Sequence, residues 1–216
     1  MNIPTKITTA RIILVAALLV GLFVVTLIPD LDVPVYGDVN LVNLIACIVF
    51  IVAASTDFVD GHLARKWHQV TNLGKFLDPV ADKMLVDSML IFFIFRFDYE
   101  PTQTLLMPAF CVIVMVVRDL VVDAIRFIAA QKGQVVAANV FGKLKTVAQM
   151  VAIPVVMLNG WPFSYFDASW NPYLRIGSWL VYIATLFSLL SGIVYVVQNR
   201  GVLKEECPKG GPIDGK

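Results

Sequence analysis

Hydrophobic residues occur along this chain in long runs that are separated by short polar segments. A membrane-spanning helix needs about 20 predominantly apolar residues, with a range of about 17–25, and six segments reach this length. The pattern therefore predicts an all-α integral membrane protein with six transmembrane helices. The fifth span is the weakest of these predictions, because Pro154 interrupts it. The expected spans are residues 12–29, 40–61, 78–97, 104–130, 141–159 and 176–198.

Polar segments lie at both ends of the chain. Residues 1–11 form a short polar lead that we expect to lie as an interfacial segment at the membrane surface, with Pro4 suited to a helix start. Residues 1–199 are predicted to form a single membrane domain. Residues 200–216 are polar and rich in Gly and Pro, which predicts a disordered cytoplasmic tail.

The distribution of Lys and Arg predicts the orientation, because cytoplasmic loops carry an excess of these residues. The first, third and fifth loops are acidic and have only Arg96 and Arg175 as cations. Most other cations lie in the N-terminus, the second and fourth loops, and the tail. Six spans with both termini cytoplasmic satisfy this distribution. The link between the second and third spans then faces the cytoplasm, in a plasma membrane of bacterial type.

The composition supports the membrane prediction and excludes several kinds of site. The chain is 58% hydrophobic and 15% charged, whereas soluble domains carry about 25% charged residues. A net charge of +1 gives no global attraction to nucleic acid. Cys47, Cys111 and Cys207 are far apart and outside any C-x-x-C pattern, which indicates neither a disulfide framework nor a zinc site.

Four carboxylates cluster around the link between the second and third spans. Asp57 and Asp60 are three apart, and Asp78 and Asp82 are four apart, so each pair would share one face of a helix. Bound cations would remove the repulsion among these groups, and hard oxygen ligands favour Mg²⁺ or Mn²⁺ over zinc. Magnesium commonly shares its coordination with substrate phosphates, and the nearby Arg65 suits bidentate phosphate contact. The cluster therefore predicts a metal site that also binds a phosphorylated ligand.

The full spacing of this stretch is D-x2-D-G-x2-A-R-x8-G-x3-D-x3-D, and it resembles the signature of the CDP-alcohol phosphatidyltransferase family at all eight positions. The resemblance implies six membrane helices, a homodimer, and transfer of a phosphatidyl group from a CDP-linked lipid to an alcohol with release of CMP. It implies two divalent cations, Mg²⁺ or Mn²⁺, held by Asp57, Asp60, Asp78 and Asp82. Asp82 would also act as general base on the acceptor hydroxyl. The residues implied to line the CDP-lipid site are Asp57, Gly61, Ala64, Arg65 and Gly74, with Thr71 as a weaker addition.

Charged side chains also occur inside the third and fourth spans. Asp119, Asp123 and Arg126 share one helix face by their i, i+4, i+7 spacing, so an ion pair among them is the simplest interpretation. Lys83 and Asp87 are four apart and are expected to pair along the third span in the same way. These charges are therefore predicted to be mainly structural.

A second cationic group is not explained by pairing alone. Arg118 lies in the fourth span, and Lys143 and Lys145 lie at the cytoplasmic start of the fifth, where they also fit the usual flank of a span. Together they could form a pocket for a second phosphate, which indicates a phosphorylated acceptor. The predicted acceptor-phosphate residues are Arg118, Lys143 and Lys145, with Arg126 and Arg11 as weaker candidates.

Two further segments bear on the acceptor. N-I-P-x-K-I-T-x2-R and G-K-L-K-T-x2-Q resemble the bacterial phosphatidylglycerophosphate synthases of that family, which implies CDP-diacylglycerol and sn-glycerol 3-phosphate as substrates. Thr5 and Asp119 depart from that branch, where Asn and Glu are common, so phosphatidylglycerol (for cardiolipin) and inositol phosphate stay open as acceptors. A divalent-metal transporter is a remote alternative, because the aspartates cluster at one interface and no internal repeat is evident.

Overall fold

In the computed structural model, the chain is built almost entirely of helices. The structure describes residues 3–28, 33–37, 39–66, 72–95, 104–133, 140–167 and 169–201, and their side chains apart from residues 3–5 and 57–79. The long helices are α1 (Ile3–Thr26), α2 (Leu41–Lys66), α3 (Asn72–Phe92), α4 (Ala109–Gln131), α5 (Val140–Met157) and α7 (Ile176–Gln198). The short elements are the antiparallel strands β1 (Val35–Tyr36) and β2 (Val39–Asn40), α6 (Ser164–Asp167) and the 3₁₀ helix η1 (Pro172–Leu174).

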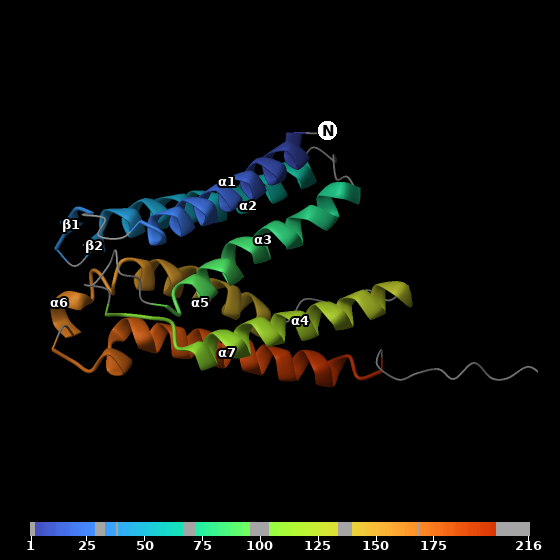
Figure 1. The fold of residues 1–216 in the computed structure, drawn as a ribbon. Helices are drawn as coiled ribbons and strands as arrows, with labels where there is room; N and C mark the ends of the chain where they lie inside the picture. The colour runs from blue at the N-terminus through green and yellow to red at the C-terminus, as the bar shows by residue number, and fades with distance from the viewer. Residues whose placement is uncertain are drawn as a thin grey trace, which may run out of the picture.

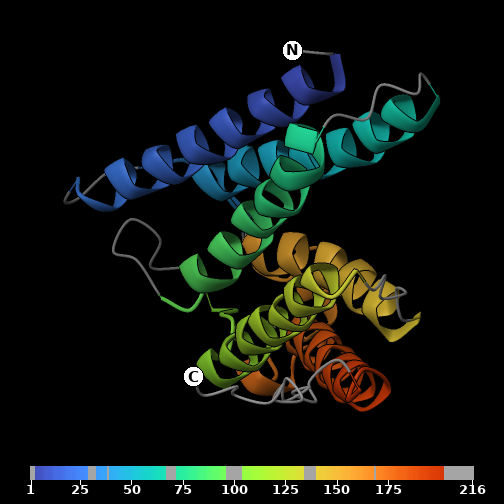
Figure 2. The same ribbon diagram turned by 90° about the vertical axis from the view of Figure 1, so that its right-hand side faces the viewer.

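The long helices form two groups of three. α1 packs against α2 and α3, and α7 packs against α5 and α4, the α5–α7 contact being the most extensive. Figure 2 shows the two groups one above the other, with α1, α2 and α3 in the upper group. Contacts of α2 with α5, and of α3 with α4 and α5, join the groups. The interior between α3, α4 and α5 is therefore enclosed by both groups.

Successive long helices run in opposite directions, so the helix ends lie at two opposite ends of the molecule. Figure 1 shows the N-terminus, the last turns of α2, α4 and α7 and the first turns of α3 at one end. We call this the motif end, because it holds the helix segments that carry the aspartate motif. β1, β2 and α6 lie at the opposite end. The arrangement brings the segments on either side of the second and fourth links to the same end of the molecule.

The close α5–α7 contact follows from the small residues of α7. From Ser178 onward its buried positions are spaced three or four apart, which places them on one helix face. Small side chains on such a face let the backbones of two membrane helices approach closely. α5 presents Ala152, Ile153 and Val156 as buried apolar residues. The buried face of α7 consists of Gly177, Ser178, Val181, Ala184, Ser188, Ser191 and Tyr195.

Hydrophobic side chains cover much of the outer surface as well as the core. Large apolar residues of α1 such as Ile13, Val20 and Phe23 are exposed, as expected for helices that face lipid. Among the described residues, three helices are long and apolar enough to cross a membrane: Lys6–Thr26 of α1, α5 and α7. A shorter apolar stretch, Leu41–Thr56, belongs to α2. The structure thus confirms a mainly helical chain with three candidate membrane spans.

The sequence placed several helix boundaries incorrectly. α1 is one continuous helix from Ile3, so the polar lead is not a separate segment from the first span. α5 continues through Pro154 to Met157, so the proline that made the fifth span the weakest prediction does not end the helix. α4 begins at Ala109, after residues 104–108, which form no regular secondary structure. The expected tail falls largely on residues 202–216, which lie outside the described residues, so its disorder stays a prediction.

α2 and α3 extend further toward each other than the hydrophobic pattern indicates. α2 continues to Lys66 and α3 begins at Asn72, whereas the apolar runs suggested residues 61 and 78. Gly61 and Gly74 therefore lie inside helices. The two aspartate pairs were expected to lie on helices, and the backbone is helical at all four positions.

The segment before α4 is held by Asn159 and by Arg175, whose Nη1 donates to Oγ1 of Thr104. Asn159 follows α5 with a left-handed φ of 51°, a conformation that Asn tolerates better than most residues. Its Oδ1 accepts hydrogen bonds from Thr104 N at 3.0 Å, Leu105 N at 3.0 Å and Thr104 Oγ1 at 3.1 Å. Asn159 is buried, so these donors depend on it. The residue therefore joins the end of α5 to the start of α4.

We predict that Asn159→Gly destabilises the protein. Glycine keeps the left-handed backbone but removes the acceptor, and leaving buried donors unpaired costs about 1–3 kcal/mol. The thermal unfolding midpoint in detergent, followed by circular dichroism, should fall. Asn159→Asp keeps the accepting oxygen and should stay closer to wild type than the glycine variant. A glycine variant as stable as wild type would contradict this role.

Candidate active site

A pocket of about 250 Å³ opens between α3, α4, α5 and α7. Five cationic and four acidic side chains line it, so we call it the charged pocket. Its wall combines residues from both groups of helices, and few of its side chains are apolar. The residues that line it are Asp82, Lys83, Val86, Asp87, Arg118, Asp119, Val122, Asp123, Arg126, Gly142, Lys143, Lys145, Thr146, Gln149 and Tyr195.

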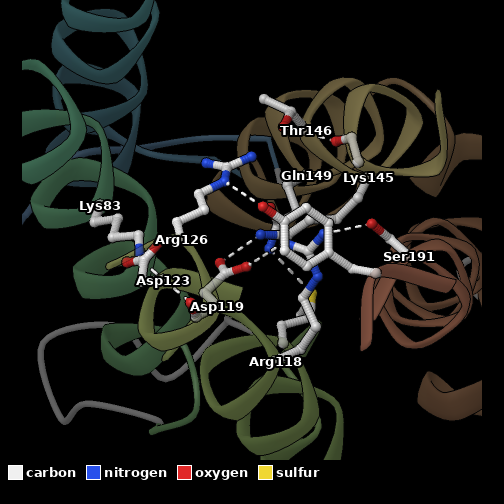
Figure 3. Close-up of polar contacts among 12 residues, drawn as sticks. Lys83, Arg118, Asp119, Asp123, Arg126, Lys145, Thr146, Gln149 and Ser191 are labelled. Atoms are coloured by element: carbon white, nitrogen blue, oxygen red, sulfur yellow. Dashed lines mark hydrogen bonds and ion pairs between the residues drawn. The ribbon is translucent and has the colours of Figure 1, made fainter. Parts of the chain in front are cut away.

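Asp119 is the centre of the polar contacts in this pocket. It lies on the inner face of α4 and its side chain is only 8% exposed. Oδ1 accepts from Arg118 Nη1 at 2.8 Å, and Oδ2 is paired with Nζ of Lys145 on α5. Figure 3 shows the carboxylate between the two cations. Because a buried charge is costly unless it is paired, this cluster fixes α4 against α5.

The two arginines of α4 reach α7. Nη2 of Arg118 donates to Oγ of Ser191, and Nε of Arg126 donates to the hydroxyl of Tyr195 at 3.1 Å. Neither arginine therefore depends on α4 alone for its position. The expected ion pair between Arg126 and the aspartates of its own helix is not among the ion pairs of the described residues. That part of the sequence interpretation is corrected.

Lys83 also pairs across helices. Its Nζ forms an ion pair with Asp123 of α4 and lies 3.5 Å from the backbone oxygen of Asp119. This contact replaces the expected pair with Asp87 on its own helix. The physical reason is that Lys83 lies where α3 faces α4, so carboxylate and carbonyl oxygens of α4 reach the lysine from outside its helix. Oδ1 of Asp87 is buried and has no hydrogen-bond partner within the described residues.

The structure brings most predicted acceptor-site residues together. Arg118, Lys143 and Lys145 all line the charged pocket, together with Asp82, which is half-buried. The weaker candidate Arg126 lines it too. The other weaker candidate, Arg11, is buried in α1 and is not among the lining residues. Arg118, Lys143, Lys145 and Arg126 therefore lie around one pocket, as a shared phosphate site would require.

The motif residues upstream of Asp82 are described only as backbone. Asp57, Asp60, Gly61, Ala64 and Arg65 lie on the last turns of α2, and Gly74 and Asp78 on the first turns of α3. Their side chains, and the whole of Thr71, lie outside what the structure describes. Among the described side chains, no group of three or more His, Cys, Asp or Glu could hold a metal ion. The four-aspartate metal site and the CDP-lipid site therefore stay predictions.

The sequence did not reveal the part that α7 plays. This helix looked like a simple apolar span, yet Ser191 and Tyr195 contact the arginines of the pocket. The available signal was polar side chains at helical spacing in an otherwise apolar segment. Gln149 was also missed as a pocket residue; it is buried in α5, and its Nε2 donates to Sδ of Met115 at 3.3 Å.

Comparisons with known proteins point to one protein family. A family model described as CDP-alcohol phosphatidyltransferase matches residues 1–190. The chain is 39% identical over 210 residues to a CDP-diacylglycerol–glycerol-3-phosphate 3-phosphatidyltransferase of Bacillus subtilis (strain 168), covering 94% of this chain and 97% of the relative. It is 34% identical over 205 residues to the protein of the same name from Haemophilus influenzae, covering 94% and 95%. The similarity therefore extends over nearly the whole of both chains.

The buried cluster yields a test of stability. We predict that Asp119→Asn lowers the free energy of unfolding by about 3–5 kcal/mol, because it leaves two buried cations without their anion. The side chain of Asp123 is 46% exposed, so its ion pair with Lys83 is screened and Asp123→Asn should cost about 1 kcal/mol or less. Unfolding of the purified variants in a detergent series measures both. Equal losses for the two variants would contradict the prediction.

Proposed function

The chain belongs to the CDP-alcohol phosphatidyltransferase family, and from this we infer that it transfers a phosphatidyl group from CDP-diacylglycerol to sn-glycerol 3-phosphate. The products are phosphatidylglycerophosphate and CMP, so the protein is an enzyme of phospholipid biosynthesis. The observation that carries this function is that Asp82, the last aspartate of the motif, lines one pocket with Arg118, Lys143 and Lys145. The names of the nearly full-length relatives support the same acceptor.

The cations of the charged pocket would bind the acceptor's phosphate. Two nitrogens of Arg118 are held by Asp119 and Ser191, while its buried Nε has no hydrogen-bond partner within the described residues. A guanidinium carries five N–H donors, two on each Nη nitrogen, so these two contacts fix the group and leave further donors for an anion. Lys143 is exposed at the pocket wall and can approach the same anion. Charge-assisted contacts of this kind are short and directional, so they would hold the acceptor in one orientation.

The bound acceptor would present its 1-hydroxyl to the CDP-lipid. The hydroxyl oxygen attacks the phosphorus on the diacylglycerol side of the pyrophosphate and forms the new ester bond. A carboxylate oxygen of Asp82 takes the hydroxyl proton. The bond from that phosphorus to the bridging oxygen breaks, and CMP leaves with the electron pair. Holding the two substrates at adjacent positions removes much of the entropic barrier to this step.

The donor set of the motif fits divalent cations. Four carboxylates without sulfur or clustered imidazole suit Mg²⁺ or Mn²⁺, and Asp57, Asp60, Asp78 and Asp82 would hold two such ions. When bound, they would stabilise negative charge on the transferring and leaving phosphates. Gly61, Ala64 and Gly74, which have little or no side chain, would leave room for the CDP group, and Arg65 and Thr71 would supply polar contacts.

The charged pocket also bears on the course of the chain through the membrane. α3 and α4 direct Asp82, Lys83, Arg118 and Asp119 into the pocket, so their charge does not prevent these helices from spanning. We take all six long helices as spans, with the motif end and both termini cytoplasmic and the enzyme in the plasma membrane. Soluble sn-glycerol 3-phosphate would then reach the pocket directly. The homodimer stays a prediction from the family resemblance.

The first test is the reaction itself. Purified protein in detergent with CDP-diacylglycerol, sn-glycerol 3-phosphate and Mg²⁺ should release CMP and form the lipid product in equal amounts. EDTA should stop turnover, and added Mg²⁺ or Mn²⁺ should restore it, because the motif supplies only hard oxygen ligands. Inositol phosphate and phosphatidylglycerol, tested as acceptors under the same conditions, should give little product. Folded wild-type protein that used one of these and ignored glycerol phosphate would overturn the acceptor assignment.

The second test addresses the proposed base. Asp82→Asn should lower kcat by about 10²–10⁴-fold, because the amide cannot take the acceptor's proton. Asp167→Asn is a matched control at the opposite end of the molecule, where Asp167 Oδ2 accepts from Ile176 N at 2.7 Å and an amide oxygen can do the same. The control should retain nearly wild-type kcat. Near-normal turnover in Asp82→Asn would remove Asp82 from the base role.

A further inference from the structure

We propose that α7 positions the arginines of the acceptor site, with Ser191 and Gly192 fixing Arg118 and with Tyr195 fixing Arg126. Ser191 and Gly192 are not among the residues that line the charged pocket, and Tyr195, which does line it, has its hydroxyl bonded to Arg126. The role proposed for all three is to act through the arginines. They would hold two cationic side chains in the geometry that binds the acceptor's phosphate. This inference rests on the proposed function and adds a role for a helix that the sequence indicates only as a span.

Arg118 passes α7 at a point where only glycine fits. A Cβ at position 192 would lie 2.8 Å from Cγ of Arg118, which is closer than two such carbon atoms approach without displacement. Just beyond this point, Nη2 donates to Oγ of Ser191. Gly142 of α5 borders the same group on another side, since a Cβ there would be in ordinary contact with Nη2 at 3.6 Å. The guanidinium is thus enclosed by α5 and α7 while Asp119 holds its Nη1.

Arg126 is fixed one helical turn further along α7. Its Nε donates to the hydroxyl of Tyr195 at 3.1 Å, and its Cζ lies 5.6 Å from the centroid of that ring. Tyr195 is 1% exposed and packs against Val122 and Ile125, whereas Arg126 is exposed. A rigid buried ring therefore restrains a long side chain that would otherwise sample many rotamers. Ordering that side chain before the ligand arrives lowers the entropic cost of binding.

Position along α7 distinguishes these residues from other polar groups of the helix. Ser188 lies on the same buried face as Ser191, but its Oγ has no hydrogen-bond partner within the described residues. Tyr182 donates its hydroxyl to the backbone oxygen of Tyr173, near the end of the molecule opposite the motif. Tyr195 lines the charged pocket and Ser191 contacts it through Arg118, whereas Ser188 and Tyr182 have neither relation to it. Ser188 and Tyr182 are therefore matched controls on the same helix.

The proposal predicts which kinetic constant changes. The arginines would bind the acceptor, whereas the CDP-lipid site is predicted on α2 and α3. Loosening Arg118 or Arg126 should therefore raise KM for sn-glycerol 3-phosphate and leave KM for CDP-diacylglycerol nearly unchanged. A merely structural contact between α7 and α4 would instead affect both constants or only stability.

The experiment measures both KM values and kcat for Ser191→Ala and Tyr195→Phe, each of which removes one hydroxyl. Losing a hydrogen bond to a charged group should raise the acceptor KM about tenfold, with less than about a twofold change in KM for the CDP-lipid. The fall in kcat should be smaller than the rise in the acceptor KM. Ser188→Ala and Tyr182→Phe make the same chemical changes on the same helix and should alter either KM by less than about twofold.

Several results would overturn the positioning role. One is an acceptor KM in Ser191→Ala and Tyr195→Phe that matches the two controls; another is an equal rise in both KM values. Gly192→Ala should raise the acceptor KM as well, and if that variant does not fold, the two hydroxyl variants decide. Wild-type protein that gave no product with sn-glycerol 3-phosphate would instead overturn the proposed function, which separates the two failures.

Discussion

The architecture of the charged pocket depends on one buried carboxylate. Asp119 lies inside α4, where an unpaired charge would be costly, and it is neutralised by Arg118 beside it and by Lys145 of α5. Arg118 and Lys145 are themselves largely buried. Their positive charges therefore require the aspartate as a counter-ion, just as its negative charge requires them. Ser191 then extends the cluster to α7. A single set of contacts therefore joins three helices and places cations around an opening, which makes packing and ligand binding inseparable in this part of the molecule.

Hydrophobic run length predicted the number and approximate place of the long helices, because each run had to be helical to satisfy its backbone in lipid. It could not predict helix ends that continue into polar sequence. α2 continues past Gly61 to Lys66, and α1 includes the polar lead. Backbone hydrogen bonds can continue a helix into polar residues, so a helix end need not coincide with the end of a hydrophobic run. Pro154 marked the fifth span as the weakest prediction, and α5 nevertheless continues through it to Met157. The six-span topology itself goes beyond the three apolar helices that composition identifies.

The site was predictable in its chemistry and less so in its contacts. Motif spacing identified Asp82, and the cationic character of Arg118, Lys143 and Lys145 indicated a shared phosphate site that the pocket is consistent with. Pairing could not be predicted, because spacing along one helix says nothing about a neighbouring helix. Lys83 pairs with α4 for this reason. The part played by α7 was missed because its serine and tyrosine residues look like ordinary small and aromatic packing residues of a membrane span.

The same contacts explain why α3 and α4 are not apolar by composition. A helix that lines a polar pocket within a membrane must be polar on one face and apolar on the other. α4 shows this division: Asp119 and Arg118 face the interior contacts, whereas Phe110, Ile113 and Leu120 are exposed on the outside. The charged residues of such a helix gather on the face that lines the pocket, while its lipid-facing surface stays hydrophobic. The charges of α3 and α4 are therefore the expected consequence of a polar pocket between helices, and they do not argue against either helix as a span.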